Sequence, residues 1–236
     1  MDPSSTTLLP LAISPKVMIW LTPLWLVGVG ALAASVALVA VYFVLRQLLP
    51  KVMAVALTTT KEALSQPLFY VILGVGAFLI LLFPFIPYNT FGEDVKVLKD
   101  EGLTLIMVLS IVLALWTASV SIADEIEGRT ALSVLSKPIG RRSFIVGKFL
   151  GVIGPVAILF IVLGALFLGS VSYKVVYDTR ETGKQLPTRE ECQEEMLQIV
   201  PGLALAFLEA VVLTSIGVAI STRLPMIPNL IICISI

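Results

Sequence analysis

Long uninterrupted apolar stretches dominate the hydrophobic pattern of this chain. No Asp, Glu, Lys or Arg occurs in residues 17–45, 63–92, 102–123 and 149–173. A fifth stretch, residues 196–222, contains a single acidic residue, Glu209. Because about 20 apolar residues in a helix span the roughly 30 Å hydrocarbon core of a bilayer, each stretch is long enough to cross a membrane. The pattern predicts a polytopic α-helical membrane protein.

Shorter segments complete the predicted architecture. Residues 51–66, KVMAVALTTTKEALSQ, place apolar side chains near helical spacing, which predicts a short amphipathic helix in the membrane interface. The polar residues 174–198 predict an outer loop with a short helix around Arg189–Leu197. Residues 226–236 are apolar but too few to cross a bilayer, so either they lie buried against the bundle or, as we expect, they are a sixth helix cut off by the end of the sequence. The fold class is therefore all-α, with five full transmembrane helices plus a partial sixth and one interfacial amphipathic helix.

Composition agrees with a membrane protein and excludes several classes of function. The chain is 58% hydrophobic and 14% charged, whereas soluble domains carry about 25% charged residues. Sixteen basic and sixteen acidic residues balance, so no nucleic-acid partner is predicted. The chain has no His, the commonest general base and metal ligand. Cys192 and Cys233 lie far apart, so we expect neither a disulfide nor a metal site, and no catalytic residue is predicted.

The charged block at residues 124–148, DEIEGRTALSVLSKPIGRRSFIVGK, separates the third and fourth spans. Gly128 follows three acidic residues and can break the helix. The next residues are enough for one or two helical turns, and Lys137 before Pro138 is pushed out of the helical region. Arg141 and Arg142 then open the next helix. This order predicts a short cross-helix that could dock in the groove of a partner. The residues alone favour an ordinary loop with anchoring arginines.

A resemblance to a known family changes this interpretation. Residues 125–151, EIEGRTALSVLSKPIGRRSFIVGKFLG, resemble the first cytoplasmic loop in permease subunits of ABC-2-type ABC transporters. Residues 51–73 resemble the interfacial elbow helix and first span of that family. The similarity covers residues 51–151 well and the remainder only as a hydropathy pattern. The family usually has six spans beginning with the elbow. Residues 1–50 add a span before it, and the ABC-2-type transmembrane domain, residues 51–236, stops early.

The resemblance implies a permease subunit of an ATP-driven transporter in the cell (plasma or inner) membrane. Its coupling loop would rest on a separate ATPase subunit, which would bind ATP and Mg²⁺, in a homodimer or pseudo-dimer of permeases. This chain would carry no cofactor. It has no P-loop, G-x-x-x-x-G-K-[ST], because Gly147 and Lys148 are followed by Phe149. The ATPase-docking positions that the resemblance implies are Glu125, Glu127, Gly128, Arg129, Thr130, Leu135, Ser136, Lys137, Pro138, Arg141, Arg142 and Lys148.

Orientation follows from the distribution of Lys and Arg between the two sides. The side that holds residues 46–66, the charged block and Arg223 carries a small excess of these residues. Cytoplasmic loops are rich in Lys and Arg. We therefore expect the block to be cytoplasmic and the N-terminus to lie outside.

Glu209 keeps other functions open. A carboxylate in hydrocarbon costs on the order of a few kcal/mol, so we expect Glu209 to face the bundle or to stay protonated. It could serve transport, or it could simply bond to Thr214 or Ser215. One alternative function is an ATP-independent secondary transporter that uses Glu209. Another is a non-transporting membrane scaffold whose loop recruits a soluble partner.

A glycine pattern follows the charged block. Gly147, Gly151 and Gly154 form a small-residue face that allows close helix contact. We expect this face to pack inside the chain rather than to form a dimer seam.

Overall fold

The computed structural model describes residues 23–86, 93–127, 140–181, 187–221, 228 and 231–232. All regular elements in these ranges are helical. In chain order they are α2 (Leu24–Leu48), α3 (Pro50–Ser65), α4 (Pro67–Leu82), the 3-10 turn η1 (Phe83–Phe85), α5 (Asp94–Glu127), α7 (Arg141–Glu181), α8 (Arg189–Leu197) and α9 (Ile199–Ser221). Within these ranges, five helical segments are long and apolar enough to cross a membrane. The predicted all-α class with five spans is confirmed.

Helices α5 and α7 extend beyond their apolar stretches at both ends, whereas the other spans lie within or near theirs. Proline opens both α3 and α4, where its missing N–H costs nothing. The short helix expected at Arg189–Leu197 is α8, and a capping box at Thr188 and Glu191 starts it. The predicted start of the first span and most of the partial sixth helix lie outside the described residues.

One boundary prediction is wrong. The polar outer loop was expected to begin at residue 174, but α7 continues to Glu181. The reason is tertiary, because Lys174 is fully buried and its Nζ lies 3.7 Å from a carboxylate oxygen of Asp94 in α5. A charge that is paired inside the bundle does not need to end the helix.

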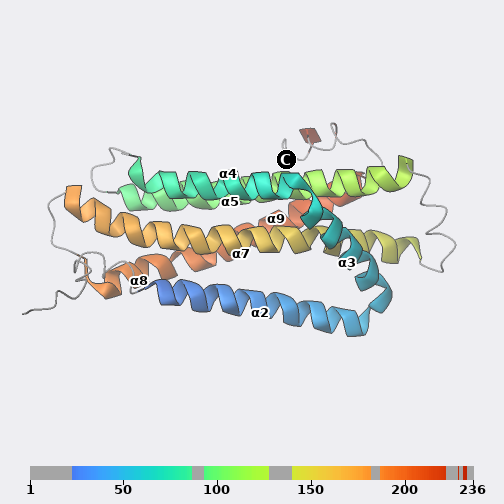
Figure 1. The fold of residues 1–236 in the computed structure, drawn as a ribbon, viewed down its shortest axis with the longest axis horizontal. Helices are drawn as coiled ribbons and strands as arrows, with labels where there is room; N and C mark the ends of the chain where they lie inside the picture. Colours follow the sequence, from blue (N-terminus) through green and yellow to red (C-terminus); the bar gives the residue numbers. More distant parts are fainter. Residues whose placement is uncertain are drawn as a thin grey trace, which may run out of the picture.

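Helix α7 is the central element of the bundle. It runs between α4 and α5 on one side and α2 on the other, while α9 crosses it and α3 lies obliquely across it (Figure 1). It contacts every other described helix. Its side chains Leu159, Leu163 and Phe167 are almost fully buried and belong to the main hydrophobic core. The helix that follows the charged block is thus the one through which the other helices are connected.

Helix α2 is the most peripheral span. None of its residues is buried, and among the described helices it contacts only α7 and α3. Near its start, Leu24 lies against Gly169 of α7. At its other end it continues almost directly into α3. The extra N-terminal span therefore lies beside the bundle and is attached to it through α7 and α3.

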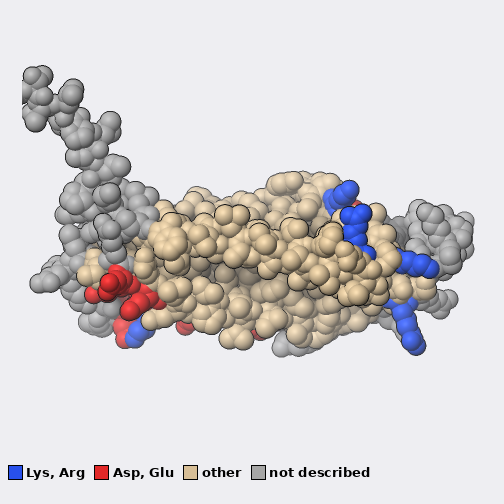
Figure 2. Space-filling view, turned by 90° about the horizontal axis from the view of Figure 1, so that it is seen from below, with Lys and Arg blue, Asp and Glu red and all other residues tan. Residues whose placement is uncertain are grey.

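Charged side chains separate between the two ends of the bundle. Most exposed Lys and Arg gather at one end and most exposed Asp and Glu at the other (blue and red in Figure 2), although Lys96 is exposed at the acidic end and pairs with Glu93 there. The basic end holds the end of α2, the start of α3 and the start of α7, and its exposed cations include Arg46, Lys51 and Arg142, while the exposed Lys61 lies further along α3 beside the exposed acid Glu62. The acidic end holds the start of α5 and helix α8, and its exposed acids include Glu93, Asp100, Glu101, Glu190, Glu191 and Glu194.

Candidate coupling site

The two helices that flank the charged block reach the basic end together. Helix α5 ends there at Glu127, and α7 begins there at Arg141 (Figure 1). Arg142 is exposed in the first turn of α7. For Glu125, Glu127 and Arg141 the structure describes the helical backbone. The other predicted docking positions before α7 lie outside the described residues, namely Gly128, Arg129, Thr130, Leu135, Ser136, Lys137 and Pro138.

Lys148 links the two flanking helices. Its Nζ donates hydrogen bonds to Oγ of Ser121 at 2.6 Å and to the carbonyl oxygen of Ser121 at 3.2 Å. It also lies 5.7 Å from the ring centroid of Phe144. Hydrogen bonds from a charged donor are stronger than those from a neutral one. The residue is only 3% exposed in the chain by itself, and its role in docking stays a prediction. In the described residues it holds α7 against α5.

The glycine face of α7 packs tightly against α3. A Cβ atom on Gly147 would lie 2.9 Å from the carbonyl oxygen of Val52, and one on Gly151 would lie 2.9 Å from that of Ala56. Thr60 adds a hydrogen bond from its Oγ1 to the carbonyl oxygen of Gly151 at 2.9 Å. Close packing within the chain is confirmed, and its partner is the amphipathic helix. The face consists of Gly147, Gly151 and Gly154.

A second set of contacts, at the acidic end, joins α7 to α5 and α5 to α8. Lys174 of α7 pairs with Asp94 of α5, as described above. Lys99 of α5 forms an ion pair with Glu195 of α8 and donates a hydrogen bond to Gln198 at 3.1 Å. Sequence reasoning missed these contacts, since the partners are separated by up to 99 residues and no local pattern connects them.

Glu209 lies on the surface of the bundle. It sits midway along α9 and is exposed, between the exposed side chains of Leu205, Leu208 and Val212. Of the two expected outcomes, the first, that Glu209 faces the bundle, does not hold for this chain by itself, and the second, that it stays protonated, stays a prediction. The hydroxyl of Thr214, one of the two expected partners, donates to the carbonyl oxygen of Ala210 instead. Because apolar residues lie on all sides of α9, its sequence offers no signal of which face turns inward.

The polar groups of the described residues make contacts between helices. Within those ranges, no three His, Cys, Asp or Glu side chains gather as a metal site would require. The buried polar groups named above join helices to one another. The fold and these contacts define a multi-span helical membrane protein with one basic and one acidic end.

Comparison with known proteins assigns the family. A family model described as "ABC-2 family transporter protein" matches residues 94–225, more than half of the 236-residue chain. The chain belongs to this family and is a membrane transport component. The match runs from the start of α5 past the end of α9 and includes the charged block. No curated protein matches significantly, and neither does any solved structure.

Proposed function

We propose that this chain is a permease subunit that moves its substrate through conformational changes driven by a separate ATPase subunit. The ATPase docks on the charged block of residues 124–148 at the basic end. When it binds and hydrolyses ATP with Mg²⁺, the block shifts and moves the ends of α5 and α7. This chain performs no covalent chemistry. Membership of the ABC-2 family supports the proposal.

The observation that carries the proposal is the anchoring of α7 beside the block. Lys148 connects α7 to α5, and the glycine face joins α7 to α3 at backbone contact. Packed interfaces shift as units rather than deform continuously. A displacement of the block therefore moves α3, α5 and α7 together. Because α7 contacts every other described helix, the displacement reaches the whole bundle.

The distribution of charge supports a cytoplasmic position for the docking end, since exposed Lys and Arg gather there. The membrane is then the cell (plasma or inner) membrane, with the N-terminus outside. A cysteine introduced as Lys61→Cys in a Cys233→Ser background tests this. A membrane-impermeant maleimide should label it only after the cells are permeabilised. Labelling of intact cells would show that the docking end lies outside the cell, contrary to the proposed orientation.

Docking can be tested by co-purification. The reading frames beside this gene are searched for a Walker-A ATPase, which is co-expressed with the chain, and the bound ATPase and its ATP hydrolysis are measured. We expect Arg141→Glu combined with Arg142→Glu to release the ATPase. Lys61→Glu is the matched control, because Lys61 is also an exposed cation but lies on α3. Retention of the ATPase by the double variant, with unchanged hydrolysis, would refute docking at this site.

Lys148→Met separates docking from transmission. Lys148 is buried and holds α7 against α5, so this variant should keep the ATPase bound while substrate-independent stimulation of ATP hydrolysis falls. Lys148→Arg, which keeps the charge, should restore part of the stimulation. If Lys148→Met instead releases the ATPase, as the double variant with Arg141→Glu and Arg142→Glu is expected to do, Lys148 belongs to the docking surface and not to the contact that transmits motion.

The exposed α9 surface supports assembly into a dimer of permeases. A carboxylate at mid-membrane depth is costly in contact with lipid, and a second permease copy that covers Glu209 removes it from lipid. Light scattering of the purified chain should give the mass of a dimer. Glu209→Arg should yield monomers, whereas Glu62→Arg on α3 should not. A dimer that survives Glu209→Arg contradicts this interface.

The two other functions receive less support. A secondary transporter would need Glu209 in a transport pathway inside the bundle, whereas the residue is exposed on the bundle surface. A scaffold that only recruits a partner would not need α7 to be anchored to both α3 and α5. The stimulation measured with Lys148→Met distinguishes the scaffold from the permease.

A further inference from the structure

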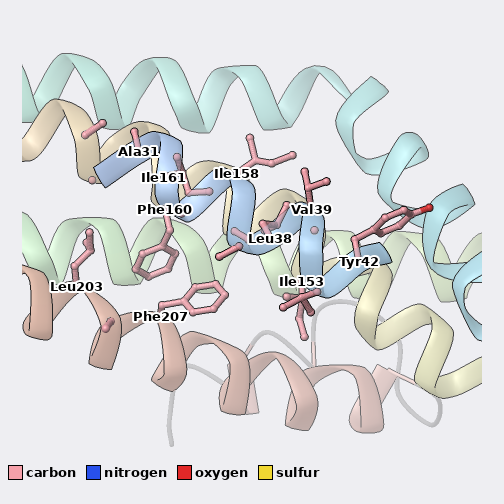
Figure 3. Close-up of a pocket in the computed structure, with 18 of the residues that line it drawn as sticks. Ala31, Leu38, Val39, Tyr42, Ile153, Ile158, Phe160, Ile161, Leu203 and Phe207 are labelled. Carbon is pink, nitrogen blue, oxygen red and sulfur yellow. The ribbon is translucent and has the colours of Figure 1, made fainter. Parts of the chain in front are cut away.

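An apolar cavity of about 680 Å³ separates α2 from the rest of the bundle (Figure 3). Its walls come from α2, α3, α7 and α9. Small residues on α2 create the space, and a Cβ atom added to Gly30 would meet nothing within 4 Å. Part of the opposite wall is formed by Phe160 of α7 and Phe207 of α9, whose rings meet edge to face at a centroid distance of 5.3 Å. The volume lies within the range of about 300–1,000 Å³ that is typical of ligand sites.

The lining determines what can fill this cavity. Among the described residues that line it, the only polar side chains are those of Tyr42 and Thr60. The Thr60 hydroxyl already donates to α7. Apolar cavities do not retain water. Helices α2 and α9 both line the cavity but do not contact each other, so the gap between them opens toward the bilayer. A hydrocarbon chain from the bilayer is the occupant that this geometry accepts.

The charged residues near one end of the cavity indicate the headgroup charge of the lipid whose hydrocarbon chain fills it. Tyr42 lines that end, and Arg46 lies four residues further along the same face of α2. Lys51 follows at the start of α3, and both cations are exposed. Helix α2 contains no acidic residue. Tyrosine is suited to the boundary between hydrocarbon and water, and arginine binds phosphate oxygens with two parallel hydrogen bonds. The end of the cavity therefore complements a headgroup with net negative charge.

We propose that this cavity binds one acyl chain of an anionic glycerophospholipid, with the phosphate beside Arg46, Lys51 and the hydroxyl of Tyr42. The bound lipid fills the space between the extra N-terminal span and α7. It thereby makes α2 a stable part of the bundle. This inference goes beyond the proposed function, because it requires neither the ATPase nor the docking segment.

The test measures retained lipid. The full chain, purified in detergent, is incubated with equal amounts of phosphatidylglycerol and phosphatidylcholine that carry identical acyl chains. Size-exclusion chromatography removes free lipid, and mass spectrometry then quantifies the lipid bound per chain. We expect phosphatidylglycerol to be retained about fivefold or more over phosphatidylcholine, since each nearby cation contributes about that factor. Equal retention of the two lipids would overturn the assignment of an anionic headgroup.

Two variants test the position of the lipid. Ala34→Trp fills the cavity, whereas Ala33→Trp places the same side chain on the neighbouring position of α2, which does not line it. We expect Ala34→Trp to lose most of the bound lipid and Ala33→Trp to keep it. Arg46→Glu leaves the apolar wall intact and should abolish the preference for phosphatidylglycerol. This second variant keeps the test decisive if Ala34→Trp fails to fold.

Two results would overturn the proposal from these variants. One is equal lipid retention by Ala34→Trp and Ala33→Trp. The other is a preference for phosphatidylglycerol that survives Arg46→Glu. A chain that retains no lipid because a second copy covers the cavity also overturns it, and light scattering identifies that case.

Discussion

Replacing Gly151 with alanine should loosen the contact between α7 and α3. The added Cβ atom would lie 2.6 Å from Cβ of Thr59 and 2.9 Å from the carbonyl oxygen of Ala56. The second of these atoms belongs to the backbone of α3, so a side-chain rotation cannot relieve the clash and the helices must separate. Overpacking of this kind costs about 1–3 kcal/mol. Alanine also raises helix propensity by about 1 kcal/mol relative to glycine, which offsets part of the loss.

Gly74→Ala in α4 is the matched control. A Cβ atom on Gly74 would meet nothing within 4 Å, so this variant gains the same helix propensity without a clash. The difference between the two variants therefore isolates the steric cost at Gly151. We expect Gly151→Ala to be less stable than Gly74→Ala by about 1–3 kcal/mol, which is about a 5- to 150-fold difference in the unfolding constant.

The measurement is unfolding in mixed micelles as the proportion of denaturing detergent rises, followed by circular dichroism. Both variants should first show the helical content of the unaltered chain. Equal unfolding midpoints for Gly151→Ala and Gly74→Ala would show that α3 is not in backbone contact with α7. The account of how the docking end transmits motion would then lose its structural basis.

Three further outcomes are expected. Asp94→Asn should destabilise the chain by about 3–5 kcal/mol because it leaves Lys174 buried without its charge partner, and adding Lys174→Met should restore much of this loss in the same unfolding assay. Cys192 is fully buried, so a maleimide should label it only after denaturation in a Cys233→Ser background, and rapid labelling of the native chain contradicts the packing of α8. Gly102→Ala would place a Cβ atom within 2.0 Å of a phenylalanine ring of α7 and should lower the thermal midpoint more than Gly74→Ala does.

Sequence reasoning located the spans because the bilayer sets a strict requirement. A crossing helix needs about 20 apolar residues, and the chain meets this requirement in separated stretches. The glycine face of α7 was also recognisable, since small residues at intervals of three or four share one side of a helix. The partner of this face could not be recognised, because Thr60 of α3 lies 91 residues before Gly151, to which it donates a hydrogen bond.

The contacts that sequence reasoning missed have a common physical cause. The environment of a single charged residue depends on partners that lie far away in the sequence. Lys174 looked like the start of a loop, yet Asp94 pairs with it and keeps α7 helical. Lys148 was predicted as a docking residue, and the bonds to Ser121 that bury it in the chain by itself could not be foreseen from the sequence. Glu209 was expected to face the bundle or to stay protonated, but a helix with apolar residues on all sides has no polar stripe from which its rotation could be predicted.

The contact between α3 and α7 has a consequence for how the protein is made. The 91 residues between Thr60 and Gly151 take about 5–20 s to translate at typical rates of synthesis. During that time α3 has left the ribosome while its packing partner does not yet exist. Its amphipathic sequence gives it a resting place at the membrane surface, where Val52 and Met53, which are buried in the folded chain, can be shielded by lipid. The apolar face of α3 thus has two successive roles. It first anchors the nascent chain at the membrane surface, and it later packs against α7.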